Sequence, residues 1–208
     1  MENFEILFEQ KIAETIKSVD PAHDMQHFKR VVALAKKLSA IESADLNVVV
    51  PAAWLHDFVL VPKDSPQRSK ASRLSAEKAI KYLTSINYPA EYLEQIFHSI
   101  EAHSFSAKVP PIGVEAQIVQ DADRLDALGA IGIARCFATA GVLKRAFYNM
   151  EDAFCKQREP NDSEYTIDHF YSKLLQLSSS MQTASGRAEA QRRVDFMKIY
   201  LNELAREI

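Results

Sequence analysis

The sequence has few of the residues on which several common protein classes depend. It contains two cysteines, Cys136 and Cys155, which form no CxxC pair and are too few for a disulfide framework. With five glycines, it has neither a GxGxxG nor a GxxxxGK[ST] phosphate loop, and the GxSxG and HExxH motifs are missing as well. These absences exclude a disulfide-rich secreted scaffold and the commonest nucleotide-loop, serine-hydrolase and zinc-protease designs.

The sequence also lacks long apolar runs and an excess of basic charge. Acidic residues occur throughout the first turns and interrupt any apolar run there, so neither a signal peptide nor a membrane span is predicted. A net charge of -3 provides no basic stripe for a nucleic-acid polymer. We therefore expect a cytoplasmic protein with no membrane and no nucleic-acid polymer as partner, whereas a single nucleotide remains allowed.

Apolar residues recur at helical spacing in almost every segment. The first stripe consists of Phe4, Leu7, Phe8, Ile12 and Ile16. Alternating patterns typical of strands are scarce, and the length of 208 residues suits one core. The sequence predicts an all-α fold with a single compact domain over residues 1–208.

Capping and breaking residues indicate where helices in the first half begin. Asp24 is placed to cap a second helix, and Ser72 to cap the helix after a polar loop over residues 60–72. A third helix is expected over residues 52–58, although Pro51 makes its start uncertain.

The second half is also expected to be helical. Residues 114–140 are predicted to form two helical pieces, with Gly129 and Gly132 permitting a bend and Gly141 ending the second piece. A polar loop over residues 149–163 precedes two final helices. The apolar residues of those final helices fit either a core or a homodimer interface, and periodicity does not decide between them.

Four separated residues on predicted helices could bind one metal ion: His27, His56, Asp57 and Asp123. Two imidazole nitrogens and two carboxylate oxygens suit Mn²⁺, Fe²⁺, Ni²⁺ or Zn²⁺, and leave coordination positions for water and substrate. Each member has a simpler interpretation when taken alone. His56 could be a hydrogen-bonded core histidine, Asp57 could end a helix, and Asp123 could pair with Arg124.

The order H…HD…D and its surroundings resemble the HD superfamily of metal-dependent phosphohydrolases, and in particular its small stand-alone bacterial members. The segments that carry the resemblance include AHDMQHFKRV, AAWLHDF, EAHSFSAKVPP and QDADRLDALGAIGIAR, and the similarity extends over nearly the whole chain. It implies a helical metal-binding core over about residues 20–140, with the C-terminal helices over about 164–206 packed on it. It also implies one divalent metal per chain, Mn²⁺ first, with Mg, Fe, Ni, Zn or Co as alternatives.

Members of similar subfamilies hydrolyse nucleotides, in some cases releasing pyrophosphate from nucleoside triphosphates. The resemblance thus implies a small phosphorylated substrate and favours a nucleotide. Two alternatives remain open. One is a regulatory module that binds metal or nucleotide without turnover, and the other is a di-iron oxygenase, which would need extra histidines that are missing between Asp57 and His98.

Helical spacing nominates supporting residues around the four candidate ligands. Arg30 lies one turn from His27, so its planar fork could hold a phosphate through two hydrogen bonds. Asp126 lies one turn from Asp123 and could orient a ligand or a water molecule. Asp121 is rotated to the other side of that helix and is expected to be structural.

The remaining candidates are histidines and loop cations. Asp57 and His98 are assigned catalytic roles and His103 a substrate contact, because imidazole changes protonation near neutral pH. A polar helix end packed on its neighbours explains both histidines equally well. Lys70 and Arg68 are expected to bind substrate phosphates, with a solvated loop as the alternative.

Overall fold

The structure, a computed structural model, describes residues 2–15, 24–61, 65 and 67–208, and for Glu2 and Arg68 it describes the backbone alone. Within these ranges the chain is helical, and its one β-type contact is an isolated bridge between Ala146 and Tyr165. The all-α prediction is confirmed. The α-helices are α1 (Glu2–Thr15), α2 (Met25–Glu42), α3 (Leu46–Leu55), α4 (Ala71–Ser85), α5 (Leu93–His103), α6 (Val114–Leu125), α7 (Gly129–Val142), α8 (Asp168–Ser172) and α9 (Ala184–Glu207). The short 3₁₀ helices are η1 (Arg68–Lys70), η2 (Ala90–Tyr92), η3 (Phe105–Ala107) and η4 (Leu174–Ser180).

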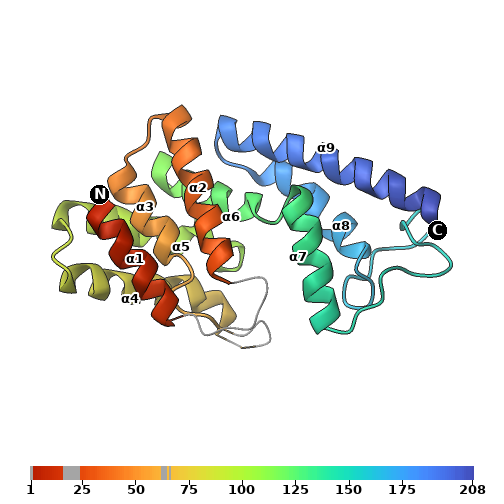
Figure 1. Cartoon of the computed structure of the whole chain (residues 1–208), viewed down its shortest axis with the longest axis horizontal. Helices are drawn as coiled ribbons and strands as arrows, with labels where there is room; N and C mark the ends of the chain where they lie inside the picture. Colours follow the sequence, from red (N-terminus) through yellow and green to blue (C-terminus); the bar gives the residue numbers. More distant parts are fainter. Residues whose placement is uncertain (1, 16–23, 62–64, 66) are drawn as a thin grey trace.

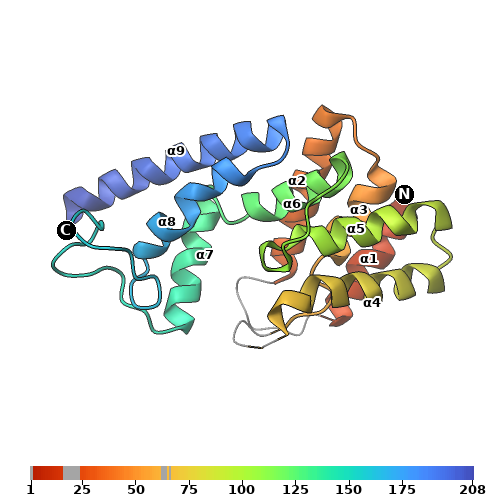
Figure 2. The ribbon, with the colours of Figure 1, turned by 180° about the vertical axis from the view of Figure 1, so that it is seen from behind.

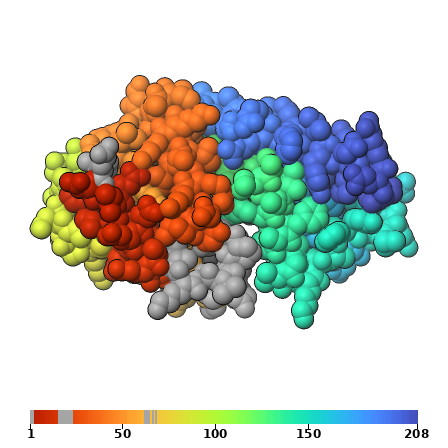
Figure 3. Space-filling model, in the orientation of Figure 1, coloured from red at the N-terminus to blue at the C-terminus, as the bar shows by residue number. Residues whose placement is uncertain are grey.

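The helices form a group around α3, which is buried from Val48 to Leu55. Helix α3 packs against α1, α2, α5 and α6, and α4 covers α5 from outside (Figures 1 and 2). Helices α7 and α8 lie at the other end of the molecule, and the long α9 begins beside α2 and α6 and runs out to that end, where the C-terminus lies. The space-filling view shows the C-terminal segments side by side at that end (Figure 3).

The start of α2 is as predicted, whereas α3 begins earlier than expected. The Asp24 carboxylate accepts the backbone N–H of His27 at 2.9 Å and caps α2. Pro51 lies inside α3 rather than before it, and its missing N–H deprives the Asn47 carbonyl of its helical donor. The Tyr88 hydroxyl replaces that donor at 2.6 Å. This hydrogen bond from a residue distant in the sequence compensates for the proline inside α3. The helix ends just before His56.

Two other predicted boundaries were wrong, and one was confirmed. Helix α4 begins at Ala71, directly after η1, so Ser72 lies buried inside the helix and does not cap it. Gly141 lies within α7, which continues to Val142. The predicted bend is present: α6 and α7 meet at 62°, and Gly129 has a φ of +72° that favours glycine.

The described residues include no single helix that is long and apolar enough to cross a membrane. Only α6 and α7 taken together across their bend satisfy length and composition.

Asp121 joins α6 to the start of α9. Its buried carboxylate accepts the backbone N–H groups of Gln182 and Thr183 at 2.8 Å each, and the Thr183 hydroxyl at 2.7 Å. Gly186 lies against this carboxylate so closely that a Cβ there would overlap it. The structural interpretation of Asp121 is confirmed, and the contact fixes where α9 crosses α6.

Gly132 should be intolerant of a side chain, because a Cβ at this position would overlap the backbone carbonyl of Ala127 at the α6–α7 bend. We expect Gly132→Ala to lower the free energy of unfolding by about 3 kcal/mol, the upper range for overpacking. Gly141 is a matched control in the same helix, since its Cβ would meet nothing within 4 Å. Gly141→Ala should stabilise the protein by about 0.5–1 kcal/mol in urea unfolding. Equal effects of the two substitutions would contradict this account.

Candidate metal centre

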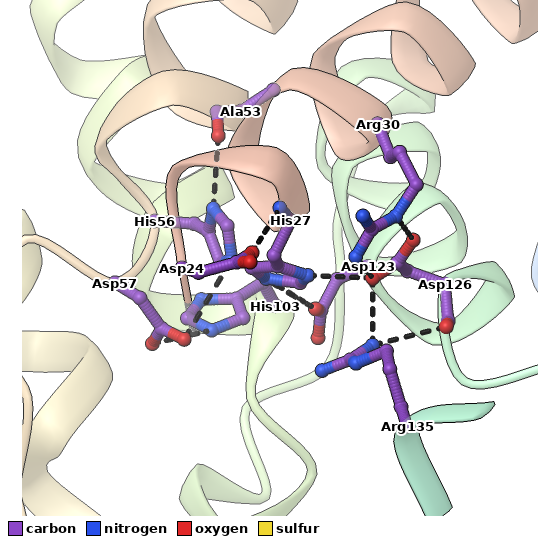
Figure 4. Close-up of polar contacts among 10 residues, drawn as sticks. All are labelled: Asp24, His27, Arg30, Ala53, His56, Asp57, His103, Asp123, Asp126 and Arg135. Carbon is purple, nitrogen blue, oxygen red and sulfur yellow. Dashed lines mark hydrogen bonds and ion pairs between the residues drawn. The ribbon is translucent and has the colours of Figure 1, made fainter. Parts of the chain in front are cut away.

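Two buried imidazoles face each other between α2 and the end of α3. His27 is on the first turn of α2, where Asp24 caps the helix, and His56 follows the last residue of α3. Their exposed fractions are 1% and 0%, and their Nε2 atoms are 3.3 Å apart (Figure 4). Such burial normally requires a polar partner for every ring nitrogen.

The partners of the two Nδ1 atoms determine which tautomer each ring adopts. His27 Nδ1 lies 2.8 Å from Asp126 Oδ2, and His56 Nδ1 lies 2.9 Å from the Ala53 carbonyl oxygen. Because these oxygens can only accept, we assign the proton of each neutral ring to Nδ1. Both Nε2 lone pairs are then directed toward the same point, which is the arrangement of metal-binding histidines.

Two carboxylates complete this set of donors. Asp57 Oδ2 lies 3.7 Å from His56 Nε2, while Asp123 Oδ1 lies 3.6 Å from His27 Nε2 and 3.8 Å from His56 Nε2. Ligand atoms of His27, His56 and Asp57 lie within 4.8 Å of one another. Burial lowers the pKa of His56 to about 4, against the opposing charge of Asp57, and so keeps the ring neutral. Lone pairs and carboxylate oxygens converging in this way fit a divalent cation.

His103 and His98 have different surroundings in the structure. His103, at the end of α5, is 4% exposed; its Nδ1 donates to the Ile100 carbonyl at 2.6 Å, and its Nε2 lies 3.5 Å from Asp57 Oδ1. Burial opposes its protonation, but the hydrogen bond to Asp57 and the nearby carboxylate charges outweigh burial and raise the pKa of His103. Its ring also meets the His56 ring edge to face, with centroids 4.9 Å apart.

His98 does not fit the catalytic role expected from the sequence. Its Nε2 accepts the backbone N–H of Ile112 at 2.9 Å, which holds the loop before α6 against α5. Five residues of helix turn it about 140° away from His103. This backbone contact is what the polar-helix-end interpretation expects of His98, whereas His103 lies in the cluster.

Asp126 is hydrogen-bonded to one of the candidate metal ligands, His27, and to two arginines. Its carboxylate is 1% exposed and accepts hydrogen bonds from His27 Nδ1, from Arg30 Nε at 2.6 Å and Nη2 at 3.0 Å, and from Arg135 Nη1 at 2.7 Å. Burial alone would raise its pKa, but the hydrogen bonds from His27 and Arg30 and the charge of Arg135 hold the pKa well below its usual range. Asp126 is therefore an ionised carboxylate that orients His27.

These contacts give Arg30 a partner within the protein and add a residue that the sequence did not reveal. Arg30 directs two of its nitrogens at Asp126, so the structure gives no support to its predicted role as a phosphate clamp. Arg135, from α7, also donates to the Asp126 backbone carbonyl at 3.0 Å. It lies beyond the α6–α7 bend, and helical spacing cannot place a residue across a bend.

The predicted loop cations are only partly described. Lys70 is exposed in η1, while the side chain of Arg68 lies outside the described part of the structure. Their neighbour Arg73 pairs with Glu77 at 3.3 Å and Glu101 at 3.2 Å, so it is a surface ion-pair residue. Of these basic residues, Lys70 remains a candidate for contacting substrate.

Comparisons with known proteins find a matching family model and similar solved structures. The HD domain family model matches residues 25–128, a span that contains the four candidate ligands and Asp126. The uncharacterized protein YpgQ of Bacillus subtilis is 33% identical over 190 residues, which cover 89% of this chain and 84% of YpgQ. The crystal structure of YpgQ in complex with ADP has a TM-score of 0.73 at 33% identity and covers 98% of this chain and 96% of that one. The structure of an HD-superfamily hydrolase from Bacillus thuringiensis has a TM-score of 0.75 at 31% identity, with coverages of 99% and 95%.

Proposed function

Because the chain belongs to the HD domain family, whose structurally similar proteins include an HD-superfamily hydrolase, we propose that it is a metal-dependent phosphohydrolase that acts on nucleotides. The observation that carries the proposal is the convergence of His27, His56, Asp57 and Asp123. The ADP in the YpgQ complex supports a nucleotide as the substrate class. The proposed reaction releases pyrophosphate from a nucleoside triphosphate.

These four residues would hold one divalent metal per chain, with Mn²⁺ the first candidate for a mixed nitrogen and oxygen donor set. When bound, a divalent metal supplies an activated water and polarises a phosphoryl oxygen. Asp126 keeps the Nδ1 proton of His27 in place, and the Ala53 carbonyl does so for His56. The protein thereby keeps both Nε2 atoms unprotonated and fixed in direction.

His103 is the residue best placed to move a proton. Its Nδ1 is held by Ile100, and its Nε2 faces Asp57, a carboxylate with 17% of its side chain exposed. A proton on Nε2 would lie beside Asp57, where a leaving or phosphoryl oxygen of a bound substrate could accept it. We propose that His103, instead of His98, is the general acid, and that Lys70 neutralises substrate charge from η1.

Hydrolysis of a panel of nucleoside mono-, di-, tri- and cyclic phosphates by Mn²⁺-loaded protein tests this function. We expect triphosphates to yield monophosphate and pyrophosphate, and Asp57→Ala to reduce turnover to the level of chelator-treated protein. Asp195→Ala is the control, because Asp195 is an exposed carboxylate on α9. Nucleotide binding without hydrolysis would favour a regulatory module, and release of neither phosphate nor pyrophosphate from any ester would refute the proposal.

A further inference from the structure

Phe105 is an aromatic side chain left exposed close to the candidate metal centre. It is 76% exposed and begins η3, two residues after His103. Two residues of chain span at most about 7 Å. A single exposed apolar residue is common on protein surfaces, so the case depends on what surrounds the ring.

The surroundings combine a rigid support with positive charge. Arg124 Cζ lies 6.0 Å from the centre of the Phe105 ring, and Arg124 is the residue directly after Asp123. Its Nη1 donates to the Ser180 carbonyl at 2.6 Å, which holds the guanidinium in place. The 3₁₀ helix η3 also packs against η1, which carries Lys70, and against α4 and α5. Arg124 is thus held beside the Phe105 ring, and η1, the 3₁₀ helix that carries the exposed Lys70, packs against η3.

A nucleotide has two chemically different ends, and this region offers a complement to each. An aromatic ring supported by a guanidinium is a stacking surface for a nucleobase, because every base has a π-face. Phosphates are attracted to cations and to a metal centre. Phe105 is on the chain segment that joins the metal centre at His103 to the surface, so one ligand can contact both.

We propose that Phe105 is the platform on which the substrate's nucleobase stacks, with the phosphates directed toward His103 and the metal centre. This proposal rests on the proposed function, since it assumes that the ligand of the centre is a nucleotide. Stacking without base-edge hydrogen bonds predicts little discrimination among the four bases at this position.

Equilibrium binding separates the base from the phosphates and needs no turnover. Calorimetric titration of Mn²⁺-loaded protein with ADP and with inorganic pyrophosphate should show Phe105→Ala weakening ADP binding about tenfold while leaving pyrophosphate binding unchanged. Phe105→Trp should restore ADP affinity because it keeps an aromatic face. Phe196→Ala is the control, since Phe196 is a partly exposed phenylalanine on α9.

Each alternative result is informative. Unchanged ADP affinity in Phe105→Ala, or an equal loss of affinity for ADP and pyrophosphate, would contradict the proposed stacking of the nucleobase on Phe105. So would wild-type protein that binds ADP no more tightly than pyrophosphate. A selective loss of ADP affinity in a protein that hydrolyses no nucleotide would leave the platform standing and reject the proposed enzymatic function, so the two failures are distinguishable.

Discussion

Asp126→Ala is expected to weaken Mn²⁺ binding by about 10–100-fold, the usual effect of removing a residue that orients a metal-binding histidine. It should also lower the free energy of unfolding by about 3–5 kcal/mol, because the substitution leaves two guanidinium groups and an imidazole without their buried anion. The structure gives the reason for both effects: the same carboxylate accepts from His27, Arg30 and Arg135. Isothermal titration with Mn²⁺ and urea unfolding measure the two effects separately.

A second His–Asp pair in the chain provides the control. Asp162 accepts from His169 Nδ1 at 2.7 Å, but its side chain is 42% exposed and no guanidinium competes for it in the described contacts. Asp162→Ala should therefore leave Mn²⁺ affinity unchanged and cost at most about 1 kcal/mol. If Asp126→Ala bound Mn²⁺ as tightly as the control, Asp126 would be a structural residue with no influence on the centre.

The sequence was most informative where the physical cause is local. The Asp24 cap, the apolar face of α2 and the bend at Gly129 each depend on residues within a turn or two, and each is present in the structure. The sequence was least informative where the local structure depends on a residue far away in the chain. Pro51 is accepted inside α3 because Tyr88 supplies a hydrogen bond to Asn47, and nothing near Pro51 in the sequence indicates that contact.

The same distinction applies to the candidate site. The family resemblance nominated both imidazoles that the structure brings together, and helical spacing nominated Asp126 as a residue that orients a ligand. Spacing could not tell His98 from His103, because the difference lies in what each ring meets: a backbone N–H from Ile112 in one case and the Asp57 carboxylate in the other. Only the direction of each side chain in three dimensions distinguishes the surroundings of the two histidines.

Removing the metal should lower the thermal stability of the protein substantially. The centre places two unprotonated Nε2 atoms 3.3 Å apart and brings carboxylates within 3.8 Å of them, an arrangement that a cation stabilises only in the folded state. Mn²⁺ at a hundred times its dissociation constant should stabilise the fold by about 2.7 kcal/mol. For a chain of this length that corresponds to a rise in Tm of roughly 5–10 °C over chelator-treated protein.

Differential scanning calorimetry with and without Mn²⁺ measures this shift, and Asp123→Ala tests its origin. The Asp123 side chain is 30% exposed, so its removal should leave the fold intact while taking one oxygen from the donor set. We expect the Mn²⁺-dependent rise in Tm to disappear in Asp123→Ala and to persist in Asp162→Ala. A rise of the same size in all three proteins would mean that Mn²⁺ binds elsewhere, since only a cation held by the His27–His56 pair and its carboxylates depends on Asp123.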